Sequence, residues 1–446
     1  MDGEMWKLLQ RFIALRTVSA DPAADNEFAH AENFLTAALA SLGFSVQTFP
    51  TAEHHPILLG TRGSANAPTA LLIYGHYDVQ PANCDGQWSS DPFFLVERDG
   101  KLYGRGVADD KGPIAAILSA LRSAGDLPNL RITFVLEGSE EIGSPSFLDF
   151  LKTNHGNMRA DAAIVLDTGC PEELRPAITT SLRGILPFEV CLTTGERDLH
   201  SGFGGCVPNA IQELLRLCSR LHGPDGRVAV PGFYDGISLA GCDCVSVATG
   251  EDEQFAKEMG VRNLQCLFPQ LPRHAVHGVL PSLDFNGIWS GYQGLGSKTI
   301  IPAVASAKFT VRTVAGQDQS AMGHAVEQFL KSHAPAHCQL SVKMSTAAPA
   351  YGLDWKRLDG KFIQLFSSLE SAVEAAFGTK PVHRREGGSI GVVSAFWDVL
   401  GLDSMLLGVV PPESRIHASD ENWSMESFWR TQLALEYFFK NIDQEH

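Results

Sequence analysis

Short apolar runs alternate with amphipathic segments along the first third of the chain. Residues 70–74, 130–136 and 162–166 are rich in apolar side chains, as are strands buried on both faces of a sheet. Residues 111–123 and 144–152, which follow the first two runs, have the spacing of helices. The alternation predicts an α/β fold with a mixed, largely parallel sheet flanked by helices.

The N-terminal segment is also predicted to be helical. Polar and charged side chains interrupt the apolar residues of positions 1–18, which indicates an amphipathic helix and not the continuous apolar core of a signal peptide. A second helix is expected over residues 26–42, ended by Gly43, and a strand over residues 44–49. No run approaches the roughly 18 uninterrupted apolar residues of a membrane span.

The middle of the chain has a different pattern. Amphipathic strands are predicted at residues 185–193 and 305–314, and helices at residues 209–221 and 320–333, which together favour an α+β domain.

The last part of the chain returns to the first pattern, with a helix at residues 361–377 and an apolar strand at residues 404–410. A chain of 446 residues is expected to form two domains. We predict an α/β domain formed by residues 1–182 and 350–446, interrupted by an inserted α+β domain over residues 183–349.

Composition and charge narrow the choice of partners. The sequence has 44% hydrophobic and 19% charged residues, as in ordinary globular proteins, and a formal net charge of -16. Such a surface repels phosphate backbones and anionic lipids, so neither nucleic acid nor a membrane is expected as a partner. The nine cysteines are odd in number and scattered, which favours a reducing compartment and predicts a cytoplasmic protein.

Polar residues that can bind metals follow several of the predicted strands. Because the carboxyl ends of parallel strands line one crevice, we expect these side chains to lie close together. In chain order they are His76 and Asp78, Asp109 and Asp110 just before the helix at residues 111–123, Glu137, Glu140 and Glu141, Asp167, and His417.

Each of these residues has an ordinary structural explanation when it is taken alone. A histidine after a strand is usually a hydrogen-bonded surface or core residue, and Asp109 or Asp110 could simply cap a helix. Together, however, so many carboxylates would repel one another unless they were protonated or neutralised by divalent cations. Two histidines with three carboxylates suit Zn²⁺, with Mn²⁺ or Co²⁺ as alternatives, and five ligands suit two ions if one carboxylate bridges them.

Seven sequence motifs, which occur in a fixed order along the chain, indicate a protein family. The chain resembles the carnosinase-type branch of the dinuclear-zinc metallopeptidase family, which also includes aminoacylases, glutamate carboxypeptidases and succinyl-diaminopimelate desuccinylases. The resemblance runs from about residue 10 to about residue 440. The motifs are GHYDVQP, LYGRGVADDKGP, EGSEEIGSP, DLHSGFGG, GSKTIIPAVASAKFTVR, REGGSI and RIHASDE.

The resemblance implies individual roles at the metal centre. His76 and Asp167 would bind one ion, Glu141 and His417 the other, and Asp109 would bridge them. Asp78 would orient a ligating imidazole, and Glu140 would be the general base for a metal-bridging water that attacks an amide carbonyl.

The inserted domain is implied to be a lid and a homodimer interface. His200 would stabilise the oxyanion across the dimer, and Thr299 would contact the substrate from the partner's lid. Arg312, Gly388 and Ser389 would hold the free carboxylate of the substrate. His417 would also contact the substrate.

Two other functions stay open beside a dipeptidase or short-peptide hydrolase. The same metals and the same carboxylate site would serve an N-acyl-amino-acid deacylase. A catalytically silent relative that acts as a binding protein is the third possibility, and the presence of Glu140 with all five ligands argues against it.

Overall fold

The computed structural model describes residues 3–82, 87–237, 251–265, 267–269, 271, 276–345 and 348–444. The chain divides into two compact units. The first comprises Met1–Thr180, Leu353–Arg384 and Gly391–His446, and the second comprises Ser181–Gly352 and Arg385–Ile390. The short segment Arg385–Ile390 therefore packs with the second unit, whereas the sequence-based boundaries place it with the first.

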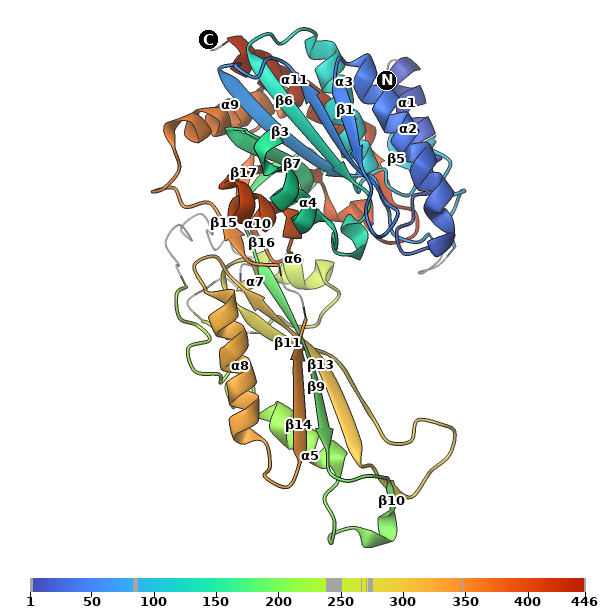
Figure 1. Ribbon diagram of the computed structural model, residues 1–446, viewed down its shortest axis with the longest axis vertical. Coiled ribbons are helices and arrows are strands. Elements are labelled where there is room, and N and C mark those ends of the chain that lie inside the picture. The colour runs from blue at the N-terminus through green and yellow to red at the C-terminus, as the bar shows by residue number, and fades with distance from the viewer. Residues whose placement is uncertain are drawn as a thin grey trace. The chain divides into compact units, whose positions relative to one another are not determined.

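The first unit is built on a mixed sheet whose central strands are parallel (Figure 1). Strands β6, β3, β7 and β17 run parallel to one another, while β1 and β2 at one side and β8 at the other pair antiparallel. The bounds are β1 Ser45–Phe49, β2 Ile57–Arg62, β3 Thr69–His76, β6 Leu130–Glu137, β7 Ala162–Gly169, β8 Ala177–Leu182 and β17 Ser404–Val410.

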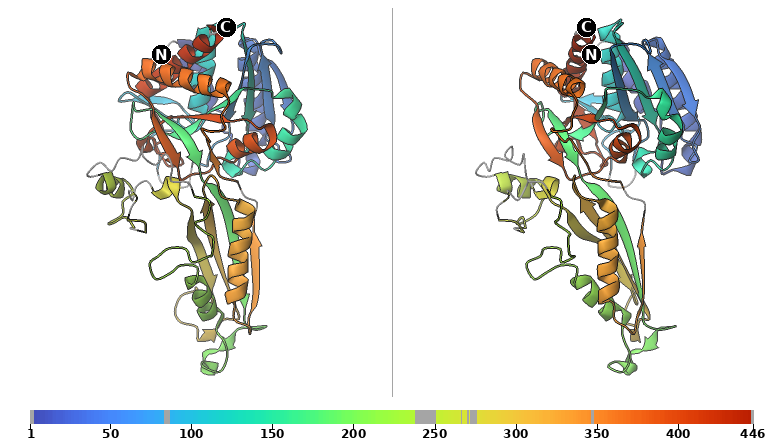
Figure 2. Two further views of the ribbon diagram at one scale, coloured as in Figure 1. Left: turned by 90° about the vertical axis from the view of Figure 1, so that its left-hand side faces the viewer. Right: turned by 60° about the vertical axis from the view of Figure 1, so that its left-hand side comes forward.

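Helices cover both faces of this sheet, and α9 and α11 lie together on one of them (Figure 2). Alternate side chains explain the two buried faces: Leu71 and Ile73 pack among α1, α3, α9 and α11, whereas Tyr74 contacts the aromatic rings of Phe147 and Phe396. The bounds are α1 Gly3–Ile13, α2 Asp25–Ser41, α3 Lys111–Ala124, α4 Phe147–Asn154, α9 Gly360–Phe377, α10 Gly391–Ala395 and α11 Met425–Gln444.

A small sheet of β4 (Val96–Arg98), β5 (Lys101–Tyr103) and β18 (Asn422–Ser424) completes this unit, and β16 (Val382–Glu386) pairs with β8. The predicted α/β class with a largely parallel sheet is confirmed. Within the part of the chain that the structure describes, none of the helices combines the length and the apolar character that spanning a membrane requires.

The second unit is an antiparallel sheet in the order β11-β13-β9-β14, with α5 and α8 packed on one face. Strand β9 alternates buried and half-buried residues, so one of its faces meets the helices and the other is only half-buried. The bounds are β9 Gly184–Thr193, β10 Leu199–His200, β11 Ser282–Ser290, β12 Ile300–Ile301, β13 Val304–Thr313, β14 Gln339–Met344, β15 Tyr351–Gly352, α5 Ala210–Ser219, α6 Glu251–Glu258, α7 Val276–Val279 and α8 Gln319–His333.

Two predicted helices differ from the structure at one end. The helix expected over residues 1–18 ends at Ile13, because the Thr17 hydroxyl donates to the Tyr77 carbonyl and Val18 forms a bridge with Val79. The helix expected over residues 144–152 begins only at Phe147, because Ser144 adopts a left-handed backbone conformation with φ of 51°.

Candidate metal centre

The metal-binding candidates of the first unit lie where its parallel strands end. His76 and Glu137 are the last residues of β3 and β6 and are register partners. Asp167 lies near the end of β7, and Asp109 lies two residues before α3. Glu140 and Glu141 begin a 3-10 turn, Glu140–Ile142, directly after β6.

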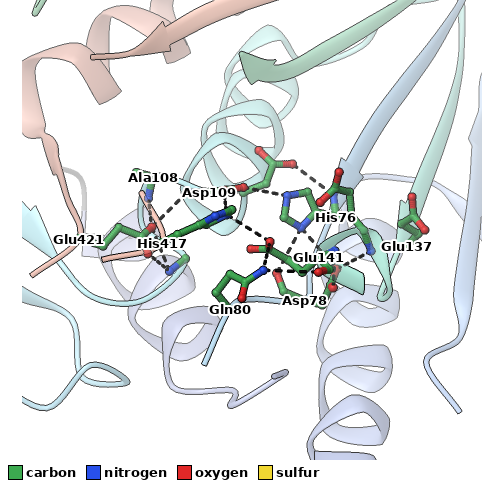
Figure 3. A network of polar contacts seen from close by, with 12 residues as sticks. His76, Asp78, Gln80, Ala108, Asp109, Glu137, Glu141, His417 and Glu421 are labelled. Atoms are coloured by element: carbon green, nitrogen blue, oxygen red, sulfur yellow. Dashed lines mark hydrogen bonds and ion pairs between the residues drawn. The ribbon is translucent and has the colours of Figure 1, made fainter. Parts of the chain in front are cut away.

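Two overlapping groups of three side chains form the centre, and Figure 3 labels His76, Asp109, Glu141 and His417 among them. His76, Asp109 and Asp167 make up one group, and Asp109, Glu141 and His417 the other; within each group the ligand atoms lie within 4.8 Å of one another. Asp109 belongs to both, because its Oδ1 is 2.8 Å from Nε2 of His76 and its Oδ2 is 3.0 Å from Nε2 of His417. One oxygen directed to each side is the arrangement that a bridging carboxylate needs.

Burial lowers the pKa of the two histidines, but hydrogen bonds to carboxylates shift it upward overall. Burial alone would lower the pKa of His76, but hydrogen bonds to Asp109 and Asp78 raise it well above its ordinary value. Hydrogen bonds to Asp109 and then to Glu141 raise the pKa of His417 to about 10. The carboxylates thus favour the protonated, positively charged form of both imidazoles. Divalent cations could displace those protons and supply the positive charge in their place.

The pKa values of the carboxyl groups are shifted by the same neighbours. Burial, with the charge of Asp109 added, raises the pKa of Asp167 well above its usual range. Burial opposes ionisation of Asp109 too, but the hydrogen bonds from His417 and His76 outweigh it and lower the pKa of that carboxyl. Two imidazole nitrogens and three carboxylates, arranged around a shared Asp109, therefore fit a pair of divalent ions.

Glu140 lies beside both groups and belongs to neither. Burial, reinforced by the charges of Asp109, Asp78 and Glu141 and opposed by His76, raises the pKa of Glu140 to about 7. A carboxyl group with a pKa near neutrality can both accept and release a proton, which is what a general base that later acts as an acid requires.

Asp78 aligns two parts of the centre at once. Its Oδ1 lies 3.4 Å from Nδ1 of His76, and its two carboxylate oxygens accept the backbone N–H groups of Glu140 at 3.2 Å and Glu141 at 3.0 Å. The sequence indicated the contact with the imidazole but not the hold on the turn that carries Glu140 and Glu141.

Two further positioning residues were not singled out from the sequence. Gln80 donates to Oε2 of Glu141 at 2.8 Å. Glu421 is only 1% exposed, and its carboxylate forms an ion pair with Nη1 of Arg105 at 2.8 Å. The same carboxylate accepts hydrogen bonds from the backbone N–H groups of Gly106, Ala108 and Asp109 (Figure 3). Both lie inside the motifs GHYDVQP and RIHASDE, so the signal was present, but one sequence does not distinguish them from solvated polar residues.

The predicted substrate residues of the second unit form two pairs. The His200 Nδ1 accepts the N–H of Gly202 at 3.1 Å, so the proton is on Nε2, which lies 3.5 Å from the Thr299 hydroxyl. Arg312 donates to the Ser389 hydroxyl at 2.7 Å, and the Gly388 carbonyl accepts the N–H of Arg183 at 3.0 Å. These pairs lie in the second unit, and the metal-binding candidates lie in the first.

Comparisons with known proteins agree with one another. The profile of peptidase family M20/M25/M40 matches residues 72–441. A Cys-Gly metallodipeptidase of Schizosaccharomyces pombe is 29% identical, covering 94% of this chain and 91% of its own length, and a Beta-Ala-His dipeptidase of Rattus norvegicus is 28% identical, covering 90% and 82%. A metallo-carboxypeptidase structure from Sulfolobus solfataricus superposes with a TM-score of 0.84 at 25% identity, covering 99% of both chains.

Proposed function

This chain belongs to peptidase family M20/M25/M40, and we propose that it hydrolyses the amide bond of dipeptides or short peptides with a free C-terminal carboxylate. The observation that supports this most directly is the pair of ligand groups that share Asp109, with Glu140 beside them. The similar proteins from Schizosaccharomyces pombe and Rattus norvegicus are dipeptidases, which favours small peptides as substrates.

Each residue of the centre has a part in this reaction. His76, Asp109 and Asp167 would hold one divalent ion, and Asp109, Glu141 and His417 the other. When bound, the ions supply a water of lowered pKa and polarise the carbonyl group of the substrate. Glu140 accepts a proton from the attacking water and passes it to the nitrogen of the leaving amine, while Asp78 keeps His76 and the turn of Glu140 in place.

Zinc is the metal that we propose, with manganese and cobalt as alternatives, because the set of two imidazoles and three carboxylates is typical of these ions. The compartment that we propose is the cytoplasm. Cys170, Cys191, Cys206, Cys218 and Cys338 are all free thiols, which supports a reducing environment.

For the second unit we propose the roles of a lid and a homodimer interface, with residues 1–182 and 350–446 as the catalytic domain and residues 183–349 inserted. His200 would donate its Nε2 proton to the oxyanion, and Thr299 would contact the substrate, both from the partner's lid. Arg312, Gly388 and Ser389 would hold the C-terminal carboxylate, and His417 would contact the substrate beside its metal.

Steady-state assays on a dipeptide panel and an N-acyl-amino-acid panel test the proposal. We expect hydrolysis of dipeptides, and we expect Glu140→Gln to lower kcat by about 10²–10⁴-fold while both metals stay bound. Preference for the N-acyl panel would assign a deacylase instead. Metal-bound protein that hydrolyses neither panel would support a binding protein and refute the proposal.

A further inference from the structure

A second arginine lies beside the proposed carboxylate site. We propose that Arg183 is a recognition residue for the C-terminal carboxylate: it fixes the loop of residues 387–389 and adds a second guanidinium to that of Arg312. This inference rests on the proposed function, since it concerns the same substrate group.

Arg183 is tied to three consecutive residues of that loop. Its Nε donates to the Gly387 carbonyl at 3.0 Å, and its backbone N–H donates to the Gly388 carbonyl at 3.0 Å. The Ser389 hydroxyl donates in turn to the Arg183 carbonyl while it accepts from Arg312. The hydroxyl that is proposed to meet the substrate is thus held between the two arginines.

Strand pairing brings Arg183 and Arg312 close together. Arg312 of β13 pairs directly with Ile185 of β9, and Arg183 precedes Ile185 by two residues. Arg183 lies one residue before β9 begins, and its Nη1 is 3.4 Å from the hydroxyl of Ser282, the register partner of Arg312 on β11, so the two arginines are near neighbours. Burial and then the charge of Arg312 lower the pKa of Arg183 to about 10, which agrees with this proximity.

The two cations are only partly offset. Of the described acidic side chains, Asp284 is the one whose charge acts on both guanidiniums, and it is exposed and accepts a hydrogen bond from the Ser282 hydroxyl at 2.7 Å. Two half-buried guanidiniums against one solvated carboxylate leave an excess of positive charge. A carboxylate ligand would be attracted by both arginines, and their planar donor groups suit its geometry.

Gly387 permits this approach. A Cβ at position 387 would lie 3.2 Å from an Nη of Arg183 and 2.8 Å from a ring carbon of His277. Gly387→Ala is therefore expected to shift the loop against both His277 and the Arg183 guanidinium without changing any charge.

The experiment compares one dipeptide with its C-terminal amide as substrates for wild type, Arg183→Gln and Arg183→Lys. We expect Arg183→Gln to raise KM for the free acid by about tenfold or more, since a charged contact is lost, with little change in kcat or in KM for the amide. Arg183→Lys keeps the charge and loses the planar donors, so its KM should be intermediate. Arg227→Gln is the matched control, because Arg227 also donates to a backbone carbonyl, that of Leu267, and stacks on Phe268.

The outcomes separate recognition from structural support. Equal losses on acid and amide in Arg183→Gln would overturn the inference. If Arg183→Gln does not fold, Arg183→Lys and Gly387→Ala decide: a reduced preference for the acid supports the inference, and an unchanged preference overturns it. If wild type hydrolyses neither compound, the proposed function fails, and binding of the two compounds by calorimetry decides the inference by the same comparison.

Discussion

The two units carry polar sites of opposite charge on sheets of different kinds. In the first unit, acidic side chains gather at the ends of parallel strands, and their hydrogen bonds and charge raise the pKa of His76 and of His417. In the second unit, Arg183 and Arg312 lie close together at the end of an antiparallel sheet where β9 begins, with Asp284 as the offsetting acid. The first site attracts cations and the second attracts an anion, so we assign the chemistry to one and substrate recognition to the other.

This comparison predicts separable effects. Substitutions of the metal-binding residues in the first unit should change metal content and kcat, whereas substitutions of the carboxylate-binding residues in the second should change KM and leave the metals in place. A variant of a carboxylate-binding residue that loses metal, or a variant of a metal-binding residue that changes only KM, would weaken the assignment.

The largest effect is expected for Asp109→Asn. The variant keeps the size of the side chain but removes the charge that both ligand groups share, so metal content should fall and kcat/KM should drop by roughly a thousandfold or more. Metal analysis and steady-state kinetics measure the two effects together. Asp149→Asn on the exposed side of α4 is the matched control, and full metal content in Asp109→Asn would refute the bridging role.

A smaller effect is expected for Glu421→Gln. The amide keeps one acceptor oxygen but loses the charge that holds Arg105 and the backbone before α3, so the Asp109 carboxylate should be less well placed. We expect metal affinity to fall by about 10–100-fold, measured by competition with a chelator. Glu426→Gln removes an exposed carboxylate of α11 and serves as control; an affinity as high as that of wild type in Glu421→Gln would show that the loop holds without it.

The pH dependence of metal binding should follow the raised pKa of His417. Because the folded protein holds this proton up to a pKa of about 10, above the ordinary 6.5, a metal ion must displace it at neutral pH. Affinity should therefore rise with pH, by up to about tenfold per unit for each proton displaced, and level off near pH 10. Chelator competition at several pH values measures the slope, and a flat profile would mean that the imidazoles are not ligands.

The smallest effect is expected for Thr299→Val in the second unit. Loss of one neutral hydroxyl contact should raise KM by about two- to tenfold, with kcat and metal content unchanged. Kinetics with the preferred dipeptide would check this, and Thr194→Val, whose hydroxyl bonds the Ala303 carbonyl in the same unit, is the control. A loss of metal in Thr299→Val would break the division between the units.

The sequence was most informative where a strand is buried on both faces. The runs that became β3, β6, β7 and β17 are apolar over most of their length, and the positions of His76 and Asp167 at their ends followed from that pattern. Strands β11 and β14 were not predicted, because most of their side chains are exposed or half-buried and no apolar alternation marks them.

Most of the features that the sequence did not predict depend on contacts between segments that are far apart in the chain. Glu421 reaches the backbone of Asp109 across 312 residues of sequence, and Arg183 reaches Gly387 across 204. Such pairs depend on tertiary packing, which local periodicity does not encode. The roles of single residues at the centre came from the ordered motifs, whereas the position of Asp109 between His76 and His417 came from the structure.

The most direct test of the central claim is the number of metal ions bound per chain. Purified protein would be stripped with a chelator, reloaded with zinc and analysed by mass spectrometry, with protein concentration determined independently. The shared Asp109 predicts two ions per chain in wild type. One ion or fewer per chain at saturating zinc would contradict the account.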